Sequence, residues 1–251
     1  NDLVKSGEAV AVISAGHTGA AMAASLFTLG PIEGVERPAI AVLMPTVRGT
    51  SLVLDMGANV DCKPIHLLQF AVMGDVFVKH LLKNPNPRVG LLSIGEEETK
   101  GNELTKEAFK LLTETSLNFI GNIEGRDVMM GKADVIVCDG FIGNVVLKTA
   151  EGVAGAISAI LRENVGNNLM RKAGYFLMRP AFQALKTKMD YAEYGGAPLL
   201  GINGISIISH GRSSAHAIKN AIRVAMESSK SDVNRHIHHD IVQNMEMGKA
   251  K

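Results

Sequence analysis

Short apolar runs alternate with longer helix-like runs along most of the chain, and this alternation constrains the fold more than any other feature. The strand-like runs are mostly β-branched and apolar on both faces, as buried parallel strands are. They are Ala9–Ser14, Ala39–Leu43, Ser51–Asp55, Arg88–Ser93, Asn118–Gly121, Ala133–Cys138 and Ile205–Ser209. The helix-like runs are His17–Leu29, Pro64–Leu82, Asn102–Thr115, Asn144–Asn164 and Ser213–Gln243. The pattern predicts an α/β fold with a mostly parallel sheet and flanking helices.

One stretch departs from the alternation. Residues 144–191 are helix-like almost throughout, and Pro180 is expected to kink or break the helix there. We therefore expect a single α/β domain over residues 1–251, from which this stretch projects as a helical hairpin. The following segment, Tyr194–Gly201, is rich in glycine and is predicted to be a loop.

The composition is that of an ordinary globular protein, with 46% hydrophobic and 20% charged residues among 251. A net charge of +1 and the absence of Trp give no indication of nucleic-acid binding. Two cysteines cannot build a disulfide framework or a zinc site, which favours a reducing cytoplasm. No apolar run is expected to span a bilayer. The chain starts at Asn1 without a signal peptide or Met, and we expect the parent protein to contain residues before it.

The junction from Ala133 to Gly152 carries the clearest chemical signal. An apolar strand pattern leads into Asp139, and a helix-like run follows with Asn144 and Lys148. Ligands of open α/β sheets bind at the carboxyl ends of the strands, where these side chains are expected. Asn144 and Lys148 are four positions apart and therefore share a helix face.

A second junction has the same construction with different polar residues. Small residues let the backbone approach a ligand closely, and the free N–H groups of a helix start bind anions. The candidates for substrate binding in this turn are Ser14, Gly16, His17, Thr18 and Gly19. The alternative, a tight turn with a capping Thr, is equally compatible with the sequence.

A third junction follows the strand ending at Asp55. Asp55 is a candidate for substrate binding, Lys63 could hold a phosphate, and Asn59 could donate to a developing oxyanion. Asp61 is favoured as the N-cap of the helix that begins at Pro64. Of the cysteines, Cys62 is a weak candidate for a reactive thiol and Cys138 is predicted to be an inert core residue.

Two further loops contribute candidates for substrate binding. The glycine-flanked loop Gly95–Glu103 contains Lys100 and Asn102, although a solvated loop is an equally good interpretation, and Asn102 can also cap the next helix. His210 and Arg212 follow the last strand, and a guanidinium suits a phosphate or an oxyanion, although a surface charge is an equally good interpretation of Arg212.

In the C-terminal third of the chain, a histidine cluster and a basic, apolar segment are each interpreted as structural in preference to functional. The cluster of His236, His238 and His239 is interpreted as a solvated, frayed helix end rather than a metal site. The segment Leu169–Met189 mixes basic and apolar residues, and it could contact an anionic membrane or an acidic partner. The candidates for that surface are Arg171, Lys172, Phe176, Met178 and Phe182. A dimer-interface or core helix is the favoured alternative.

Several stretches together resemble one known family. They are SAGHTGA, ERPAIAVLMPT, LDMGANVDCKP, QFAVMG, RVGLLSIGEEETKGNEL, NFIGNIEGRD, ADVIVCDGFIGNVVLKTAEG, YGGAPLLG and HGRSS. In this order, and over nearly the whole chain, they resemble the PlsX family, the phosphate acyltransferases of bacterial phospholipid synthesis. Two features depart from the family pattern: an N-terminal strand with a DAMGGD-type turn is absent, and His17 stands where the family usually has Asn.

The resemblance implies an isopropylmalate-dehydrogenase-like fold, related to phosphate acetyltransferases. It implies the conversion of acyl-[acyl carrier protein] and inorganic phosphate to acyl phosphate and acyl carrier protein, without a cofactor or metal. It also implies a homodimer with the hairpin in its interface, and joint action with a membrane-bound glycerol-3-phosphate acyltransferase. The expected location is the cytoplasm, with peripheral membrane contact.

This chemistry requires no nucleophile from the enzyme, because phosphate itself attacks the thioester. We hypothesise that the Ser14–Gly19 turn binds phosphate, with charge from Lys63 or Lys148. Asn59 or Asn144 would donate to the oxyanion, and Asp139 would orient a lysine.

Two alternatives belong to other functional classes. A metal-dependent decarboxylating dehydrogenase shares the fold class but needs clustered acids, and Asp139 has no second acid at one-turn spacing. A non-catalytic module could dock acyl carrier protein at the membrane through Leu169–Met189.

Overall fold

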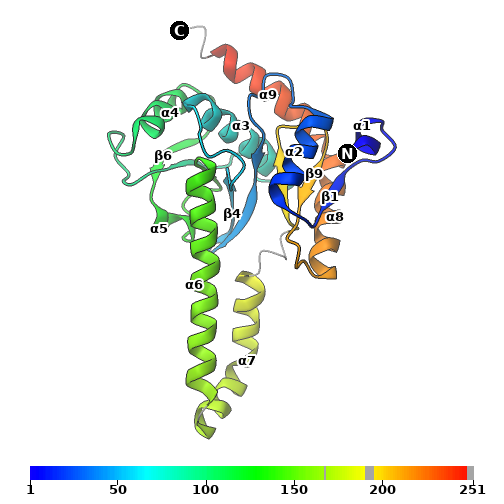
Figure 1. The fold of residues 1–251 in the computed structure, drawn as a ribbon. Helices are drawn as coiled ribbons and strands as arrows, with labels where there is room; N and C mark the ends of the chain where they lie inside the picture. Colours follow the sequence, from blue (N-terminus) through cyan, green and yellow to red (C-terminus); the bar gives the residue numbers. More distant parts are fainter. Residues whose placement is uncertain (167, 190–194, 248–251) are drawn as a thin grey trace.

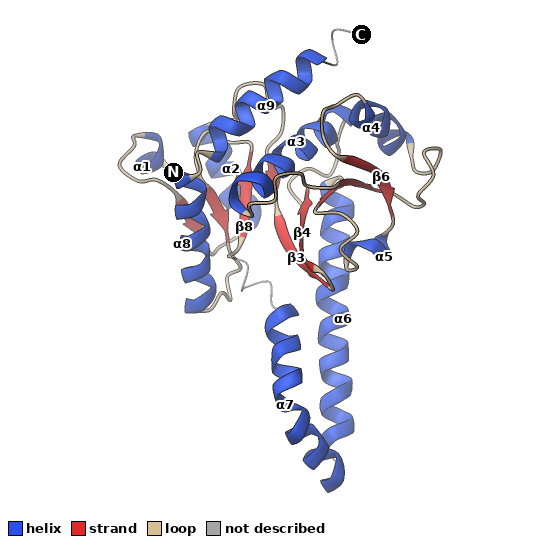
Figure 2. Ribbon diagram, turned by 180° about the vertical axis from the view of Figure 1, so that it is seen from behind, coloured by secondary structure: helices blue, strands red, loops and turns tan. Residues whose placement is uncertain are grey.

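The computed structural model describes residues 1–166, 168–189 and 195–247. It contains two sheets with helices around them, and a helical hairpin that projects from them (Figures 1 and 2). The strands are β1 (Val12–Ser14), β2 (Ala39–Ile40), β3 (Val42–Thr46), β4 (Gly49–Leu54), β5 (Val89–Leu92), β6 (Phe119–Ile123), β7 (Val135–Val137), β8 (Ala197–Leu200) and β9 (Ser206–Ile208). The helices are α1 (Asp2–Lys5), α2 (Thr18–Leu29), α3 (Pro64–Leu81), α4 (Glu103–Thr113), α5 (Gly125–Val128), α6 (Gly140–Gly166), α7 (Leu169–Met189), α8 (Ala215–Lys230) and α9 (Val233–Met247).

The larger sheet has the strand order β3-β4-β7-β5-β6, and the smaller one has the order β1-β9-β8-β2. The pairs β4–β7, β7–β5, β5–β6 and β1–β9 are parallel. This confirms the predicted α/β class with parallel strands and flanking helices. The antiparallel strands β3 and β8, and the division into two sheets, go beyond the prediction.

Three predicted boundaries are wrong for identifiable reasons. The predicted strand Ala39–Leu43 is two strands, because the Ala41 N–H donates to Pro198 O across the smaller sheet while β3 pairs with β4. The predicted loop Tyr194–Gly201 contains β8, whose apolar residues are buried between β9 and β2. The first residue of that predicted loop, Tyr194, lies outside the described residues. The predicted last helix is two helices, because Asp232 adopts a left-handed φ of 49° between α8 and α9.

The main core forms where α3 packs on the larger sheet. Its largest fully buried side chains include Phe70, Phe77, Leu52 and Leu54. Gly74 permits the close approach, since a Cβ at this position would lie 2.5 Å from Val135 Cγ1 on β7. This packing fixes α3 against β4 and β7. Because these two strands are parallel, the loops that follow them lie at the same end of the sheet.

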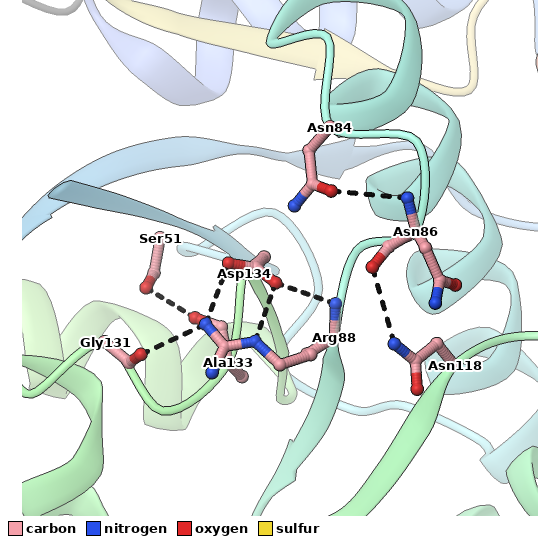
Figure 3. Close-up of polar contacts among 8 residues, drawn as sticks. All are labelled: Ser51, Asn84, Asn86, Arg88, Asn118, Gly131, Ala133 and Asp134. Atoms are coloured by element: carbon pink, nitrogen blue, oxygen red, sulfur yellow. Dashed lines mark hydrogen bonds and ion pairs between the residues drawn. The ribbon is translucent and has the colours of Figure 1, made fainter. Parts of the chain in front are cut away.

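An ion pair between Arg88 and Asp134 lies at the opposite end of that sheet, where β5 and β7 begin (Figure 3). Arg88 Nε and Nη2 donate to the two carboxylate oxygens of Asp134 over 2.9 and 3.0 Å, and the Arg88 backbone N–H donates to the same carboxylate over 2.8 Å. The Ser51 hydroxyl donates to Ala133 O over 2.7 Å. These contacts join the starts of β5 and β7 to β4.

Helices α6 and α7 lie side by side and extend away from the sheets (Figures 1 and 2). Pro180 lies inside α7 and does not end it, so the alternative in which it breaks the helix is wrong. Residues 190–194 lie outside the described residues, and with them the predicted end of the hairpin at Tyr191. Among the candidates for a membrane or partner surface, Arg171, Lys172, Phe176 and Met178 are exposed, whereas Phe182 is half-buried and stacks on Tyr175.

The expectation that no segment is long and apolar enough to span a bilayer is wrong. By length and composition alone, the α6 segment Gly140–Val165 meets that description, with mean hydropathy 1.3. Its first turns nevertheless belong to the folded α/β unit, because Gly140 N–H donates to Asn59 O over 2.8 Å and Gly143 is buried.

Candidate active site

The starts of α2, α6 and α8 meet at one cavity of about 540 Å³ between the two sheets. Its lining residues come from β2, β3, β8 and β9, from the loops after β4 and β9 and before β8, and from these helices. They are Thr18, Gly19, Ile40, Val42, Leu43, Met56, Gly57, Val60, Gly140, Phe141, Asn144, Leu147, Lys148, Glu151, Gly196, Ala197, Ile208, Ser209, His210, Arg212, Ser213, Ser214 and Ala217. Each helix start carries a partial positive charge and unpaired N–H groups, so their convergence favours an anion.

The start of α2 brings Thr18 and Gly19 to this cavity. His17 is the N-cap residue, and its Nδ1 accepts a hydrogen bond from Ala20 N over 3.3 Å. The alternative of a capping Thr is therefore wrong, because the imidazole performs that role. Ser14 and Gly16 belong to the same turn but are not among the lining residues.

The loop between β9 and α8 supplies the second positive region. Ser214 caps α8 by accepting from Ala217 N over 3.1 Å, and His210 Nδ1 accepts from Arg212 N over 3.1 Å. This places the proton of a neutral His210 on Nε2, which leaves an N–H donor free to face a ligand. The two turns are adjacent, since Ser209 N donates to Ser14 O over 2.8 Å.

Ser209 is a candidate that the sequence analysis missed. Its side chain is buried at 5% exposure and lines the cavity, and its Oγ has no hydrogen-bond partner among the described residues. A buried hydroxyl without a partner is costly, and a ligand at the cavity would satisfy it. The available sequence signal was a hydroxyl residue at the end of a buried strand, directly before His210.

Helix α6 forms the opposite wall. Asn144, Lys148 and Glu151 lie on one face of it and line the cavity together with Leu147. This confirms that Asn144 and Lys148 share a helix face. Lys148 Nζ pairs with Glu151 Oε2 at 2.9 Å, whereas Asp139 Oδ1 accepts from Ile142 N over 2.8 Å. Asp139 therefore caps the helix in this structure and is paired with a backbone N–H group.

Asp55 lies behind the cavity, where it holds the loop after β4. Its fully buried carboxylate accepts hydrogen bonds from Ile40 N (3.0 Å), Ala58 N (3.1 Å), Asn59 N (2.6 Å) and Asn59 Nδ2 (2.9 Å). Burial raises the pKa of Asp55, and these hydrogen bonds oppose the shift without cancelling it. Asn59 also donates to Pro38 O over 2.8 Å. Both side chains thus position a loop whose residues Met56, Gly57 and Val60 line the cavity.

The other predicted residues lie away from the cavity lining. Lys63 is exposed at the N-cap position of α3, and its backbone N–H donates to His66 Nδ1 over 3.1 Å. The prediction of Asp61 as that cap is wrong, because the chain enters the helix two residues later. Asn102 caps α4 by accepting from Thr105 N over 2.9 Å, which confirms its capping role, and Lys100 lies in the loop before it.

The cysteines and the histidine cluster also have clear positions. Burial and the charge of Asp55 raise the pKa of the Cys62 thiol to about 11, and burial raises that of Cys138 well above its usual value. Neither is therefore a reactive thiolate at neutral pH. His236 stacks on His80 at 3.8 Å within a helix that continues to Met247, so the frayed-end interpretation is wrong. No group of three or more metal-ligating side chains occurs among the described residues.

The sequence model of the family described as "Fatty acid synthesis protein" matches residues 1–236. The chain belongs to this family. A phosphate acyltransferase from Thermodesulfovibrio yellowstonii is 55% identical over 250 residues, which are 100% of this chain and 72% of that protein. One from Geotalea uraniireducens is 55% identical over 97% of this chain and 70% of its own length. One from Pelotomaculum thermopropionicum is 60% identical over 90% of this chain and 66% of its own length.

Solved structures give the fold independently of these sequences. The EutD phosphotransacetylase from Staphylococcus aureus superimposes with a TM-score of 0.58 at 16% identity, over 93% of this chain and 65% of that one. A phosphotransacetylase from Streptococcus pyogenes gives 0.57 at 19% identity, over 92% and 65%. Members of the fatty acid synthesis protein family thus share their α/β fold with phosphotransacetylases.

Proposed function

We propose that the chain carries the active site of a phosphate acyltransferase, which converts acyl-[acyl carrier protein] and inorganic phosphate to acyl phosphate and free acyl carrier protein. The observation that carries the proposal is the cavity where three helix starts, Arg212 and Lys148 surround a space with an apolar wall. Such a site suits an anion beside an acyl group. Relatives at 54–60% identity that bear the name phosphate acyltransferase support the same reaction.

Phosphate would bind between the starts of α2 and α8. Thr18 and Gly19 at the start of α2 line the cavity, as do Arg212 and Ser213 before α8. The guanidinium can hold two phosphate oxygens at once, and the Ser209 hydroxyl can donate to a third. The phosphate is thereby fixed and oriented before the reaction, which removes much of the entropic cost.

A phosphate oxygen then attacks the thioester carbon. The new C–O bond forms as the carbonyl oxygen becomes an oxyanion, and the C–S bond breaks as the carbonyl re-forms. The thiolate leaves on the acyl carrier protein and takes a proton from solvent. Asn144 and Lys148 lie on the wall where donors to the oxyanion are needed. Lys148 is favoured over Lys63, since Lys63 does not line the cavity.

The finer assignments follow from the same proposal. Acyl carrier protein and phosphate are the substrates, and the protein would work as a homodimer through α6 and α7. It would lie in the cytoplasm with peripheral membrane contact, near a membrane glycerol-3-phosphate acyltransferase. The exposed basic and apolar residues Arg171, Lys172, Phe176 and Met178 support such a contact.

The test is formation of acyl phosphate from long-chain acyl carrier protein and inorganic phosphate, trapped with hydroxylamine as the acyl hydroxamate. Phosphate-dependent hydroxamate is expected from the protein in its full length. Absence of product, together with binding of acyl carrier protein, would overturn the enzymatic proposal and favour the docking module.

A further inference from the structure

Six apolar side chains of the cavity lining, here called the apolar half, are not needed to hold phosphate. Its side chains come from β3, from the loop after β4 and from α6. They are Val42, Leu43, Met56, Val60, Phe141 and Leu147. The polar residues Ser209, His210 and Arg212 come from the loop after β9, so this apolar group and these polar residues come from different elements.

The apolar half is ordered by packing against the hydrophobic core. Val42 and Met56 are buried in the same hydrophobic cluster, and Leu147 packs against that cluster. Met56 N also donates to Ile40 O over 2.9 Å, which fixes the loop to the edge of β2. The wall is therefore in place before any ligand arrives, and binding would cost little ordering.

The mouth of this half is apolar as well. Val60 is 60% exposed and Phe141 is 58% exposed, and both line the cavity. Large apolar side chains at the rim of a pocket are typical of an entry for an apolar ligand.

Helix α6 connects the two halves. Phe141 and Leu147 contribute to the apolar wall, while Asn144 and Lys148 lie between and beside them on the same face. A thioester whose carbonyl lies at Asn144, next to phosphate, would have its hydrocarbon chain directed along the wall.

We propose that the apolar half of the cavity is the subsite for the acyl chain, with Leu147 and Met56 as its inner wall and Val60 and Phe141 at its mouth. This inference rests on the proposed function and adds to it the residues that determine chain length. A bulky residue at Leu147 shortens the space, so it selects against long acyl groups and leaves short ones able to react.

The test compares butyryl, decanoyl and palmitoyl thioesters of acyl carrier protein in the full-length protein, with hydroxamate trapping. In the Leu147→Trp variant, kcat/KM for palmitoyl is expected to fall at least tenfold relative to kcat/KM for butyryl, a discrimination usual for hydrophobic pockets. The matched control is Leu82→Trp, an exposed position at the end of α3 that does not line the cavity. It should leave the ratio unchanged.

A second variant covers the case in which the Trp variant does not fold. Val60→Glu places a charge at the exposed mouth and should raise the KM for palmitoyl about tenfold, with a smaller effect on butyryl. An unchanged palmitoyl-to-butyryl ratio in both folded variants would overturn the subsite.

A binding measurement separates this inference from the proposed function. A fluorescent long-chain fatty acid, cis-parinaric acid, should bind the wild-type protein and bind Leu147→Trp or Val60→Glu at least tenfold more weakly. If no thioester gives product but this binding pattern holds, the proposed reaction fails and the subsite stands. If product forms and neither ratio nor binding changes, the reaction stands and the subsite fails.

Discussion

Two groups of buried polar atoms on either side of the cavity differ in whether their hydrogen bonds are complete. The carboxylate of Asp55 accepts four hydrogen bonds from its own loop and from β2. The hydroxyl of Ser209 is also buried but has no hydrogen-bond partner among the described residues. A complete set of partners indicates a structural role, whereas an incomplete one at a cavity indicates a ligand. The same sequence signal, a polar residue at a strand end, thus has two meanings.

The largest effect on stability is expected at Asp55, whose hydrogen bonds are complete. Asp55→Ala leaves several buried N–H groups without an acceptor, and we expect a loss of about 3–5 kcal/mol in the free energy of unfolding. Urea unfolding measures it. The matched control is Asp61→Ala, an exposed carboxylate in the same loop, which should change stability by less than about 0.5 kcal/mol. Equal stability of the two variants would contradict the structural role of Asp55.

On the side of the cavity that contains Ser209, Arg212→Ala should lower kcat/KM for phosphate about hundredfold without unfolding the protein, since Arg212 is exposed and lines the cavity. The control is Arg223→Ala on α8, whose guanidinium pairs with Glu227 at 3.0 Å outside the cavity lining. An unchanged kcat/KM for phosphate in Arg212→Ala would show that Arg212 does not bind phosphate.

The two candidate lysines sharpen the comparison further. Lys148→Ala removes a cation from the cavity wall and should lower kcat/KM roughly thirtyfold, in line with a lost hydrogen bond to a charged group. Lys63→Ala removes an exposed cation at the start of α3 and should change it less than about twofold. Steady-state hydroxamate formation distinguishes them, and the reverse order would return the charge assignment to Lys63.

Ser209→Ala is the most direct test of the unpaired hydroxyl. Since no hydrogen bond to another described residue is lost, stability should be unchanged or slightly increased, while kcat/KM for phosphate should fall about tenfold. Thermal unfolding and steady-state kinetics together measure both. A loss of stability with normal kinetics would show that the hydroxyl is structural, as Asp55 is.

The smallest effect is expected at the charge pair far from the cavity. Burial raises the pKa of Asp134, but the hydrogen bonds from Arg88 outweigh this and hold it below its usual value. The carboxylate therefore stabilises the fold above the unfolded pKa of about 3.9, and this contribution is lost as pH falls through the lowered folded pKa. Because the Arg88 side chain is 39% exposed, Asp134→Asn should cost only about 1 kcal/mol at pH 7. The difference from wild type should disappear near the folded pKa, with activity unaffected at pH 7.

Local patterns in the sequence predicted much of the fold but only part of the site. The alternation of strands and helices gave the α/β class, and the four-residue spacing placed Asn144 and Lys148 on one face. The sequence could not show whether Lys63 or Lys148 lines the cavity. Both follow strand ends, and only the packing of α3 and α6 decides which lysine reaches it. The sequence patterns also missed β8, because a glycine-rich segment becomes a strand when two neighbouring edges are available to pair with it.

Helix α6 is one uninterrupted rod of 27 residues, about 40 Å long at the usual rise. Its near end is fixed by the Asp139 cap and by the close packing of Gly143 under Asp55, and its far end extends beyond the sheets (Figure 1). Mechanically it is a lever whose fulcrum adjoins the cavity. Leu147 and Ala150 pack against the buried core, so Lys148 lies within the anchored part of this lever. A force on the hairpin tip therefore acts on the residues beyond Ala150 before it reaches the space where phosphate and thioester would meet.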